Sequence, residues 1–403
     1  MENGLIINRD VIMVGLQPWD LEIGGNFKNM AFQIARQNRV LYVNKPLDRK
    51  TALTSKLDPK TITRLKSIKK GVGVLEKAAT NLWVFNPQTM LESINWLPPG
   101  RLYKIFNKLN NRRFAKQIKQ ACNNLGFKRS LLIVDNDFFN SLYLKEYLKI
   151  DFSVYYLRDY LLSQPYFYKH GILSEPELMQ KVDIVTTNSL YLTEYAQKYN
   201  ANSFYIGQGC EFEVFEKKTG HIPTDIADIP KPIIGYCGAL LSIRLDIGLL
   251  VSIAKNKPQW SIVLIGPEDE GFKKSGLHQL KNVYFLGHKQ PHSLPDYVHC
   301  FDVCLNPQLV NEMTIGNYPR KIDEYLAAGK PVVATATKAM EEFAACTYLC
   351  SDLTGYLLAI EKILASQDDA GQAHSRIEVA KSHTWEISII KLYTAINNHQ
   401  NKQ

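Results

Sequence analysis

Short apolar runs alternate with stretches of helically spaced apolar residues in the first half of the chain. Residues 11–16 form such a run, and after a loop Phe27, Met30 and Ile34 recur at the spacing of one helix face. Further apolar runs follow at residues 40–43, 131–134, 152–157 and 182–187. Strands that alternate with helices indicate a parallel sheet covered on both faces, so this half is predicted to be an α/β domain.

A second alternating series occupies the other half. It predicts strands at residues 233–237, 261–265, 283–286, 303–305 and 331–334, with helices at 246–255 and 320–328. Between the two series lies a segment typical of a linker, which holds Gly220, Pro223, Pro230 and Pro232. Thr384 is a candidate N-cap of a final helix. We therefore predict an N-terminal domain at 1–215, a linker at 216–231, a C-terminal domain at 232–383 and a terminal helix at 384–403.

Composition agrees with two globular domains. The chain has 403 residues, of which 45% are hydrophobic and 22% charged, so there is enough apolar material for two cores. A net charge of +9 favours anionic partners, and much of it lies in residues 45–70 and 101–129. The 7 Cys residues form no C-x-x-C pair, which favours reduced thiols in a cytoplasmic protein and disfavours a bound metal. No apolar stretch is long enough to predict a membrane span.

The most informative stretch is residues 311–333, NEMTIGNYPRKIDEYLAAGKPVV. Pro319 suits a helix start and Gly329 a left-handed C-cap, after which a buried strand begins. A carboxylate at the helix start, Glu324, could accept both hydroxyls of a ribose, and Lys321 could meet a phosphate. The alternative is a well-capped amphipathic helix that feeds a core strand and leaves both side chains in solvent.

This stretch resembles the donor-site helix of GT-B fold glycosyltransferases, in particular the family-four or group 1 enzymes of bacterial cell-surface polysaccharide synthesis. The resemblance implies two Rossmann-like, doubly wound α/β domains facing a cleft, with the nucleotide-sugar donor on the C-terminal domain and the acceptor on the N-terminal one. It also implies that the helix at 384–403 crosses back to the N-terminal domain. The family has two glutamates separated by seven residues, whereas Gly316 occupies the first position here and Glu312 is out of register. The ribose role of Glu324 carries over, but a retaining or inverting outcome stays open.

Residues 235–246, GYCGALLSIRLD, resemble the first strand and loop of the family's donor domain. Small residues such as Gly238 let backbone N–H groups approach a diphosphate, and Arg244 could neutralise it. The alternative is an ordinary turn with Arg244 on the surface. Gly266 and Gly287 end two further strands and are expected to border the nucleotide, since ligands bind beyond the carboxyl ends of parallel strands. Either glycine could equally serve only as a turn residue.

In the first half, Gly24 and Gly25 lie between a strand and a helix, where backbone amides can cradle an anion. In the resembling family this loop faces the cleft, so it is a candidate acceptor loop; a plain turn is the alternative. Asp159 follows another strand, and some GT-B enzymes place an acid there as the general base. A helix cap or a partner for Arg158 is its other reading. No G-x-G-x-x-G occurs, which disfavours dinucleotide binding.

The resemblance implies transfer of a sugar, of the hexosyltransferase type, from a nucleoside diphosphate to a hydroxyl acceptor without a cofactor. Arg244, Lys321 and backbone amides would stabilise the leaving diphosphate in place of a metal. The alternatives are a nucleotide-sugar epimerase of the same fold and a catalytically silent GT-B protein that binds a nucleotide or polysaccharide. The basic stretches carry no recognisable nucleic-acid motif, so no nucleic-acid partner is expected.

The basic segments also predict a location. A surface of this charge could rest on the anionic inner face of a membrane, which would fit a lipid-linked or polysaccharide acceptor in glycolipid or cell-surface polysaccharide synthesis. The helix pattern that starts at Arg101 places Leu102, Ile105, Phe106 and Leu109 on one side. The alternative is a solvated charged face whose apolar stripe is buried in the core.

Overall fold

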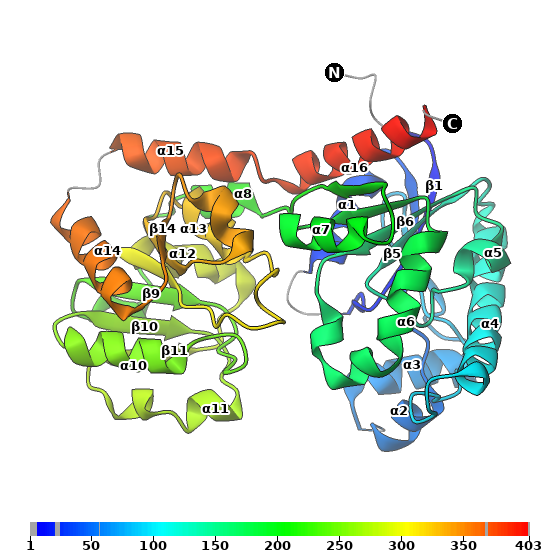
Figure 1. Ribbon diagram of the computed structural model, residues 1–403, viewed down its shortest axis with the longest axis horizontal. Coiled ribbons are helices and arrows are strands. Elements are labelled where there is room, and N and C mark those ends of the chain that lie inside the picture. The colour runs from blue at the N-terminus through cyan, green and yellow to red at the C-terminus, as the bar shows by residue number, and fades with distance from the viewer. Residues whose placement is uncertain (1–5, 21–24, 56, 367–369, 402–403) are drawn as a thin grey trace. The chain divides into compact units, whose positions relative to one another are not determined.

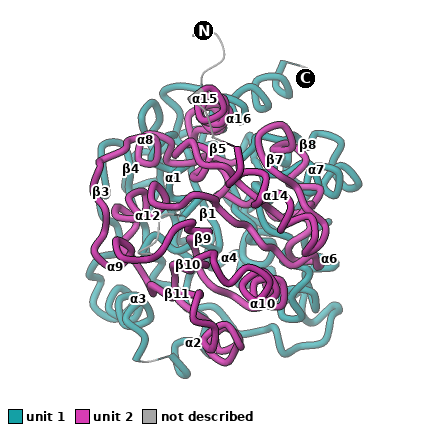
Figure 2. The backbone as a smooth tube through the Cα atoms, turned by 90° about the vertical axis from the view of Figure 1, so that its left-hand side faces the viewer, with its two compact units in different colours: residues 1–207, 388–403 teal, residues 208–387 magenta. Residues whose placement is uncertain are grey.

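The computed structural model describes residues 6–20, 25–55, 57–366 and 370–401. The chain divides into two compact units, coloured separately in Figure 2. Unit 1 comprises Met1–Gly207 with Ser388–Gln403, and unit 2 comprises Gln208–Ile387. The segment expected to be a linker, 216–231, contains a short helix whose Ile226 is buried in the core of unit 2.

Unit 1 contains an eight-stranded sheet and its covering helices (Figure 1). Its strands are β1 (Asp10–Gly15), β2 (Arg39–Val43), β3 (Leu75–Ala79), β4 (Leu82–Phe85), β5 (Leu131–Asp135), β6 (Phe152–Leu157), β7 (Ile184–Thr187) and β8 (Ser203–Tyr205). Its helices are α1 (Asn26–Ala35), α2 (Arg49–Thr54), α3 (Pro59–Lys70), α4 (Arg101–Leu125), α5 (Leu144–Leu148), η1 (Leu161–Ser163), α6 (Pro165–Lys181) and α7 (Leu190–Gln197), with α16 (Trp385–Gln400) from Ser388 onward.

The strand order of this sheet is β3-β4-β2-β1-β5-β6-β7-β8, and all pairs are parallel except β3 with β4. Every residue of β1, β5 and β6 is buried, which explains why these strands are continuous apolar runs in the sequence. On α1 the predicted face, including Phe27, Met30 and Ile34, is buried as its spacing indicated. From the last helix, the Tyr393 hydroxyl accepts a hydrogen bond from the Asn38 amide, which fastens α16 to this unit.

Unit 2 is built around a six-stranded parallel sheet of order β11-β10-β9-β12-β13-β14. Its strands are β9 (Ile233–Cys237), β10 (Ser261–Ile265), β11 (Val283–Gly287), β12 (Val303–Asn306), β13 (Val332–Thr335) and β14 (Tyr348–Cys350). Its helices are α8 (Phe212–Glu216), α9 (Thr224–Ala227), α10 (Ile247–Asn256), α11 (Glu270–Lys273), η2 (Gly276–Gln279), η3 (Pro291–Ser293), α12 (Leu294–Cys300), α13 (Lys321–Ala327), η4 (Lys338–Phe343), α14 (Leu353–Ala365) and α15 (Ala370–Lys381). The predicted α/β class with two doubly wound sheets is confirmed.

The apolar stripe predicted on α4 is exposed, so the alternative in which the stripe is part of the core is wrong. Leu102 and Ile105 are 53% and 63% exposed, whereas Tyr103, Asn107 and Asn110 face the interior. The amide of Asn110 exchanges two 2.9 Å hydrogen bonds with the backbone of Glu92, so the first turns of this face hold a loop, whereas Phe114 and Ile118 further along it join the core. The stripe is therefore on the surface. Among the described residues, no helix is both long and apolar enough to cross a bilayer.

Candidate functional site

In the sheet of unit 2, β10 and β11 lie on one side of β9, and β12, β13 and β14 lie on the other. Open α/β sheets bind ligands at such a switch point, here between β9 and β12. The two loops that leave these strands are joined by their backbones. The Leu309 amide donates to the Arg244 carbonyl at 2.8 Å, and the Asp246 amide donates to the Pro307 carbonyl at 2.9 Å. The two loops thus form one continuous wall at the carboxyl edge of the sheet.

Gly238 and Gly266 bring the ends of β9 and β10 into close contact. Their φ angles are +148° and +147°, a region that side-chain-bearing residues rarely adopt. The Gly238 amide donates to the Ile265 carbonyl at 2.8 Å, and a Cβ atom at Gly266 would lie 2.0 Å from the Gly238 carbonyl oxygen. The third predicted glycine, Gly287, accepts from the Gly266 amide at 2.9 Å, but space is open around it.

Lys321, the first residue of α13, lies against this glycine loop. Its ammonium nitrogen is 3.1 Å from the point where Cβ would stand at Gly238 and 4.8 Å from the centre of the Tyr236 ring. A cation and a closely packed backbone therefore lie together within one unit, a proximity that the sequence did not predict. This arrangement can receive a diphosphate, because a point charge and the exposed loop lie on the same side of the sheet.

Arg244 is exposed on the loop after β9, and its guanidinium makes no hydrogen bond or ion pair with the residues that the structure describes. The loop beneath it is anchored, since Asp269 accepts from both the amide and the hydroxyl of Ser242 at 2.7 Å. Asn311 adds a 3.1 Å bond to the Ile243 carbonyl from the opposite loop. A fixed backbone thus carries a cation that has no internal partner.

Glu324 lies one helical turn after Arg320, whose guanidinium donates to its Oε1 at 3.0 Å. The other oxygen, Oε2, accepts no hydrogen bond within the described chain. The carboxylate is therefore held in one orientation while retaining acceptor capacity for a ligand hydroxyl.

Asp323, beside Glu324, was not anticipated from the sequence. Its side chain is fully buried, accepts from the Tyr318 hydroxyl at 2.7 Å and lies 2.8 Å from His383 Nδ1. Burial raises the pKa of this carboxyl, and the His383 contact acts against that rise. The cluster ties α13 to the segment after α15, and thereby positions the helix that carries Lys321 and Glu324.

In unit 1, Asp159 is paired with Arg158, whose guanidinium also binds the fully buried Asp135. The Nη1 to Oδ2 distance to Asp159 is 2.5 Å, and the Nε to Oδ1 distance to Asp135 is 2.6 Å. Burial raises the pKa of Asp135, and Arg158 counteracts this. Asp159 keeps a side-chain exposure of 28%, so it is both a partner of Arg158 and reachable from solvent.

The predicted acceptor loop is only partly described, because Gly24 lies outside the described residues. Gly25 precedes α1, and there the side chain of Gln17 accepts from the Phe27 amide at 2.8 Å. A Cβ atom at Gly25 would collide with Gln17 at 1.3 Å. Helix capping by Gln17 accounts for Gly25 without a ligand.

Two parallel sheets, each with a switch point, define the GT-B fold. Sucrose-phosphate synthase from Thermosynechococcus elongatus matches with a TM-score of 0.67 at 16% identity, over 98% of this chain and 100% of that one. Anabaena HepE in complex with UDP and glucose matches with a TM-score of 0.64 at 16% identity, over 98% and 100%. These similarities establish the fold.

Comparison of the sequence with a family model and with curated proteins gives a second line of evidence. Residues 231–366, which lie within unit 2, match the family model of Glycosyl transferases group 1, and the resemblance based on residues 311–333 is confirmed. The chain is also 28% identical over 259 residues to the putative teichuronic acid biosynthesis glycosyltransferase TuaH of Bacillus subtilis (strain 168). That alignment covers 60% of this chain and 64% of the relative, slightly less than two thirds of its length.

Proposed function

We propose that this protein is a glycosyltransferase that moves a hexose from a nucleoside-diphosphate donor to a hydroxyl acceptor, without a metal or other cofactor. The observation that carries the proposal is the switch-point site of unit 2, where Lys321 lies against the open Gly238 backbone inside a group 1 domain. The HepE structure contains UDP and glucose, which supports a UDP-hexose as the first donor to test.

Each residue of the site has a chemical task in this proposal. Lys321 and Arg244 offset the negative charge that grows on the diphosphate as the glycosidic bond breaks, which is the task a metal ion performs in other enzymes. Glu324, oriented by Arg320, accepts the ribose hydroxyls of the donor. Within the described residues, no group of three His, Cys, Asp or Glu side chains is arranged to hold a metal ion.

Asp159 is the proposed general base that removes the proton of the acceptor hydroxyl. Arg158 and Asp135 fix its carboxylate, because the guanidinium is shared between the two acids. A base held in one orientation needs no reorganisation when the hydroxyl arrives.

The acceptor is proposed to be a lipid-linked sugar or a polysaccharide, used at the inner, cytoplasmic face of a membrane. The relative TuaH is named for teichuronic acid biosynthesis, which supports a cell-surface polysaccharide. On α4, exposed Leu102 and Ile105 are flanked by the cationic side chains of Arg101 and Lys104. An apolar stripe with a basic border is the surface chemistry that binds an anionic bilayer.

The test is incubation with a panel of labelled nucleotide-sugars, with and without a sugar acceptor and with a chelator in parallel. A transferase releases nucleoside diphosphate, faster with acceptor and equally fast in chelator. An epimerase returns a changed nucleotide-sugar without needing acceptor, and a silent binding protein gives neither product. Loss of release in chelator, with recovery on adding Mg²⁺, would contradict the metal-independent part alone.

A further inference from the structure

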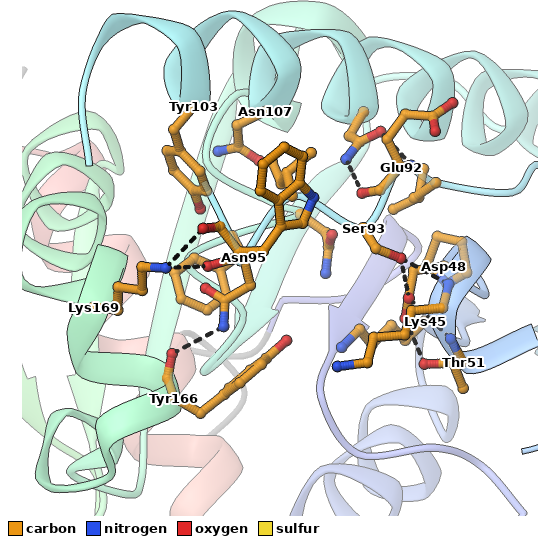
Figure 3. A pocket seen from close by; sticks show the side chains of 18 of the residues that line it. Lys45, Asp48, Thr51, Glu92, Ser93, Asn95, Tyr103, Asn107, Tyr166 and Lys169 are labelled. Carbon is orange, nitrogen blue, oxygen red and sulfur yellow. Dashed lines mark hydrogen bonds between the residues drawn. The ribbon is translucent and has the colours of Figure 1, made fainter. Parts of the chain in front are cut away.

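Unit 1 contains a cavity of about 510 Å³ that none of the predicted site residues lines (Figure 3). Its wall is formed by the segments that follow β2, β4 and β5, together with the first turns of α4 and α6. These segments leave the carboxyl ends of parallel strands, which is the edge where α/β sheets bind ligands. A cavity of this size accommodates one or two sugar rings.

The cationic side chains of the wall have no carboxylate partner. Lys45 and Lys50 are exposed and form no ion pair within the part of the chain that the structure describes. The ammonium group of Lys169 donates to two carbonyl oxygens, those of Asn95 at 2.8 Å and Trp96 at 3.1 Å. Three positive charges therefore border the cavity, and that of Lys45 is partly offset by the nearby Asp48.

The two carboxylates of the wall are already occupied. Asp48 accepts from the Thr51 amide and hydroxyl and from the Ser93 hydroxyl, at 3.1, 2.6 and 2.5 Å. Although burial raises the pKa of Asp48, the Ser93 and Thr51 hydrogen bonds lower it overall. Glu92 forms ion pairs with Arg49 and Arg113, which lie outside the wall. Both contacts lower the pKa of the Glu92 carboxyl, and the Arg49 contact has the larger effect. Both acids are held by other donors, although the charge of Lys45 also acts on Asp48 and helps to lower the pKa of its carboxyl.

An exposed aromatic ring stands on a fixed backbone at the same cavity. The side chain of Trp96 is 75% exposed, yet its carbonyl is bound by Lys169, and the preceding Asn95 donates to the Tyr166 carbonyl at 3.4 Å. Figure 3 shows Lys169 and Tyr166 beside Asn95. A large ring held by a fixed backbone at the edge of a cavity loses little freedom when it stacks on a ligand, so it is preorganised to bind one.

Sugar rings have the matching chemistry. The C–H groups on one face of a pyranose carry partial positive charge and stack on the negative face of an indole. Asn107, another residue of the wall, has an amide nitrogen that makes no hydrogen bond within the described residues. Stacking therefore selects a sugar, and the unpaired lysines select a negative charge on it.

We propose that this cavity binds an acidic saccharide, a sugar that carries a carboxylate or a phosphate, as the acceptor end of the reaction. The inference rests on the proposed function only in calling the saccharide an acceptor, because binding of the saccharide needs no donor. Trp96 is the stacking platform, and Lys45, Lys50 and Lys169 determine the preference for charge.

The experiment measures binding to the full chain without any nucleotide, by saturation-transfer NMR. Three probes share one ring: methyl β-glucoside, methyl β-glucuronide and glucose 6-phosphate. We expect the glucuronide or the phosphate to bind roughly threefold to tenfold more tightly than the glucoside at low salt, and salt to remove the difference. The stronger of the two charged probes identifies the acidic group.

Matched variants locate the binding. Trp96→Ala should abolish the signal of all three probes, whereas Tyr168→Ala, which removes another exposed ring, on α6 outside the cavity, should not. The double change Lys45→Gln with Lys50→Gln should remove the preference for charge, and Lys60→Gln, exposed on α3, should keep it. Melting curves of all variants check folding, which none of these exposed positions should disturb.

Equal affinity for the glucoside and both charged probes, or full binding by Trp96→Ala, overturns the inference. If the wild-type protein releases nucleoside diphosphate but binds no acidic probe, this inference fails and the proposed function stands. If it binds the acidic probe through Trp96 but transfers no sugar from any donor, the proposed function fails and the saccharide site stands.

Discussion

The carbonyl oxygen of Gly238 lies 2.0 Å from the point where a Cβ atom at Gly266 would stand. The contact explains why the end of β10 carries glycine, because the chain after β9 passes directly over it. The same contact places the backbone that faces Lys321, so the geometry of the proposed diphosphate site depends on the absence of one methyl group.

Gly266→Ala should therefore damage the site and the fold together. We expect a loss of about 2 to 3 kcal/mol in the free energy of unfolding from the left-handed backbone and the clash, or roughly 5–10 °C in the melting of unit 2. Calorimetry measures this. Gly276→Ala is the control, because no atom lies within 4 Å of its Cβ position. A Gly266→Ala protein that melts with the wild type contradicts the close approach.

Glu324→Gln and Arg244→Ala should weaken donor binding without lowering stability. Each removes one charge-assisted hydrogen bond to the ligand, which typically reduces affinity roughly tenfold to a hundredfold. Titration calorimetry with UDP-sugars gives the affinity, and the exposed Glu341→Gln and Lys255→Ala serve as charge-matched controls in unit 2. Wild-type affinity in both site variants would remove the donor assignment.

Asp159→Asn should reduce turnover far more than donor affinity. The amide keeps the shape of the side chain but cannot take the proton of an acceptor hydroxyl. Turnover number and donor dissociation constant are measured on the same preparation. If turnover is unchanged and only the melting temperature falls, Asp159 serves Arg158 and has no part in the chemistry.

Glu175 gives unit 1 a predictable pH dependence. Burial raises the pKa of this carboxyl to about 7, against the opposing effect of hydrogen bonds from the Tyr155 and Tyr195 hydroxyls. The folded unit then binds more protons than the unfolded chain between about pH 4.5 and 7. Its contribution to stability is complete below that window and is lost as the pH rises through it, by about 3 kcal/mol.

Glu175→Gln should remove this dependence and raise the melting temperature of unit 1 relative to the wild type at pH 8. Melting from pH 5 to pH 8 tests it, with the exposed Asp151→Asn as control. Parallel pH profiles for wild type and Glu175→Gln would show that the buried carboxyl does not titrate in this range.

The exposed stripe of α4 predicts binding to anionic vesicles at low salt, with each nearby cation adding about 1 kcal/mol. Vesicle sedimentation measures the bound fraction. A double change, Leu102→Ser with Ile105→Ser, should lower it, and Leu358→Ser, exposed on α14, should not. Failure to sediment with anionic vesicles, or sedimentation that ignores salt, contradicts the electrostatic membrane contact.

The central strands could be predicted because burial on both faces leaves a continuous apolar run, as in β6 and β10, whose bounds match the prediction. The edge strands β3, β8 and β14 and the internal strand β4 were missed. An edge such as LEKAA in β3 faces solvent and carries no apolar run, and β4 is only four residues long. On α4 the periodicity was visible, but not which face was buried, because the asparagines that pack inward are polar.

The site was predictable only where one segment carries it. Residues 311–333 made Lys321 and Glu324 candidates for the site, but the proximity of Lys321 to Gly238 is a tertiary contact over more than eighty positions. The role of Asp323 could not be predicted from the sequence, because its partner His383 lies sixty residues away. The cavity around Trp96 draws on several separate segments, none of which forms a motif.

The most direct test of the account is hydrogen exchange, read by mass spectrometry, on the whole protein with and without a UDP-hexose. Donor binding at the switch point should slow exchange in peptides that cover residues 236–246 and 314–326, and leave peptides from β10 and from unit 1 unchanged. Arg244→Ala should lose that protection at the same ligand concentration. Slower exchange confined to unit 1, or no slower exchange with any nucleotide-sugar tested, would contradict donor binding at the switch point of unit 2.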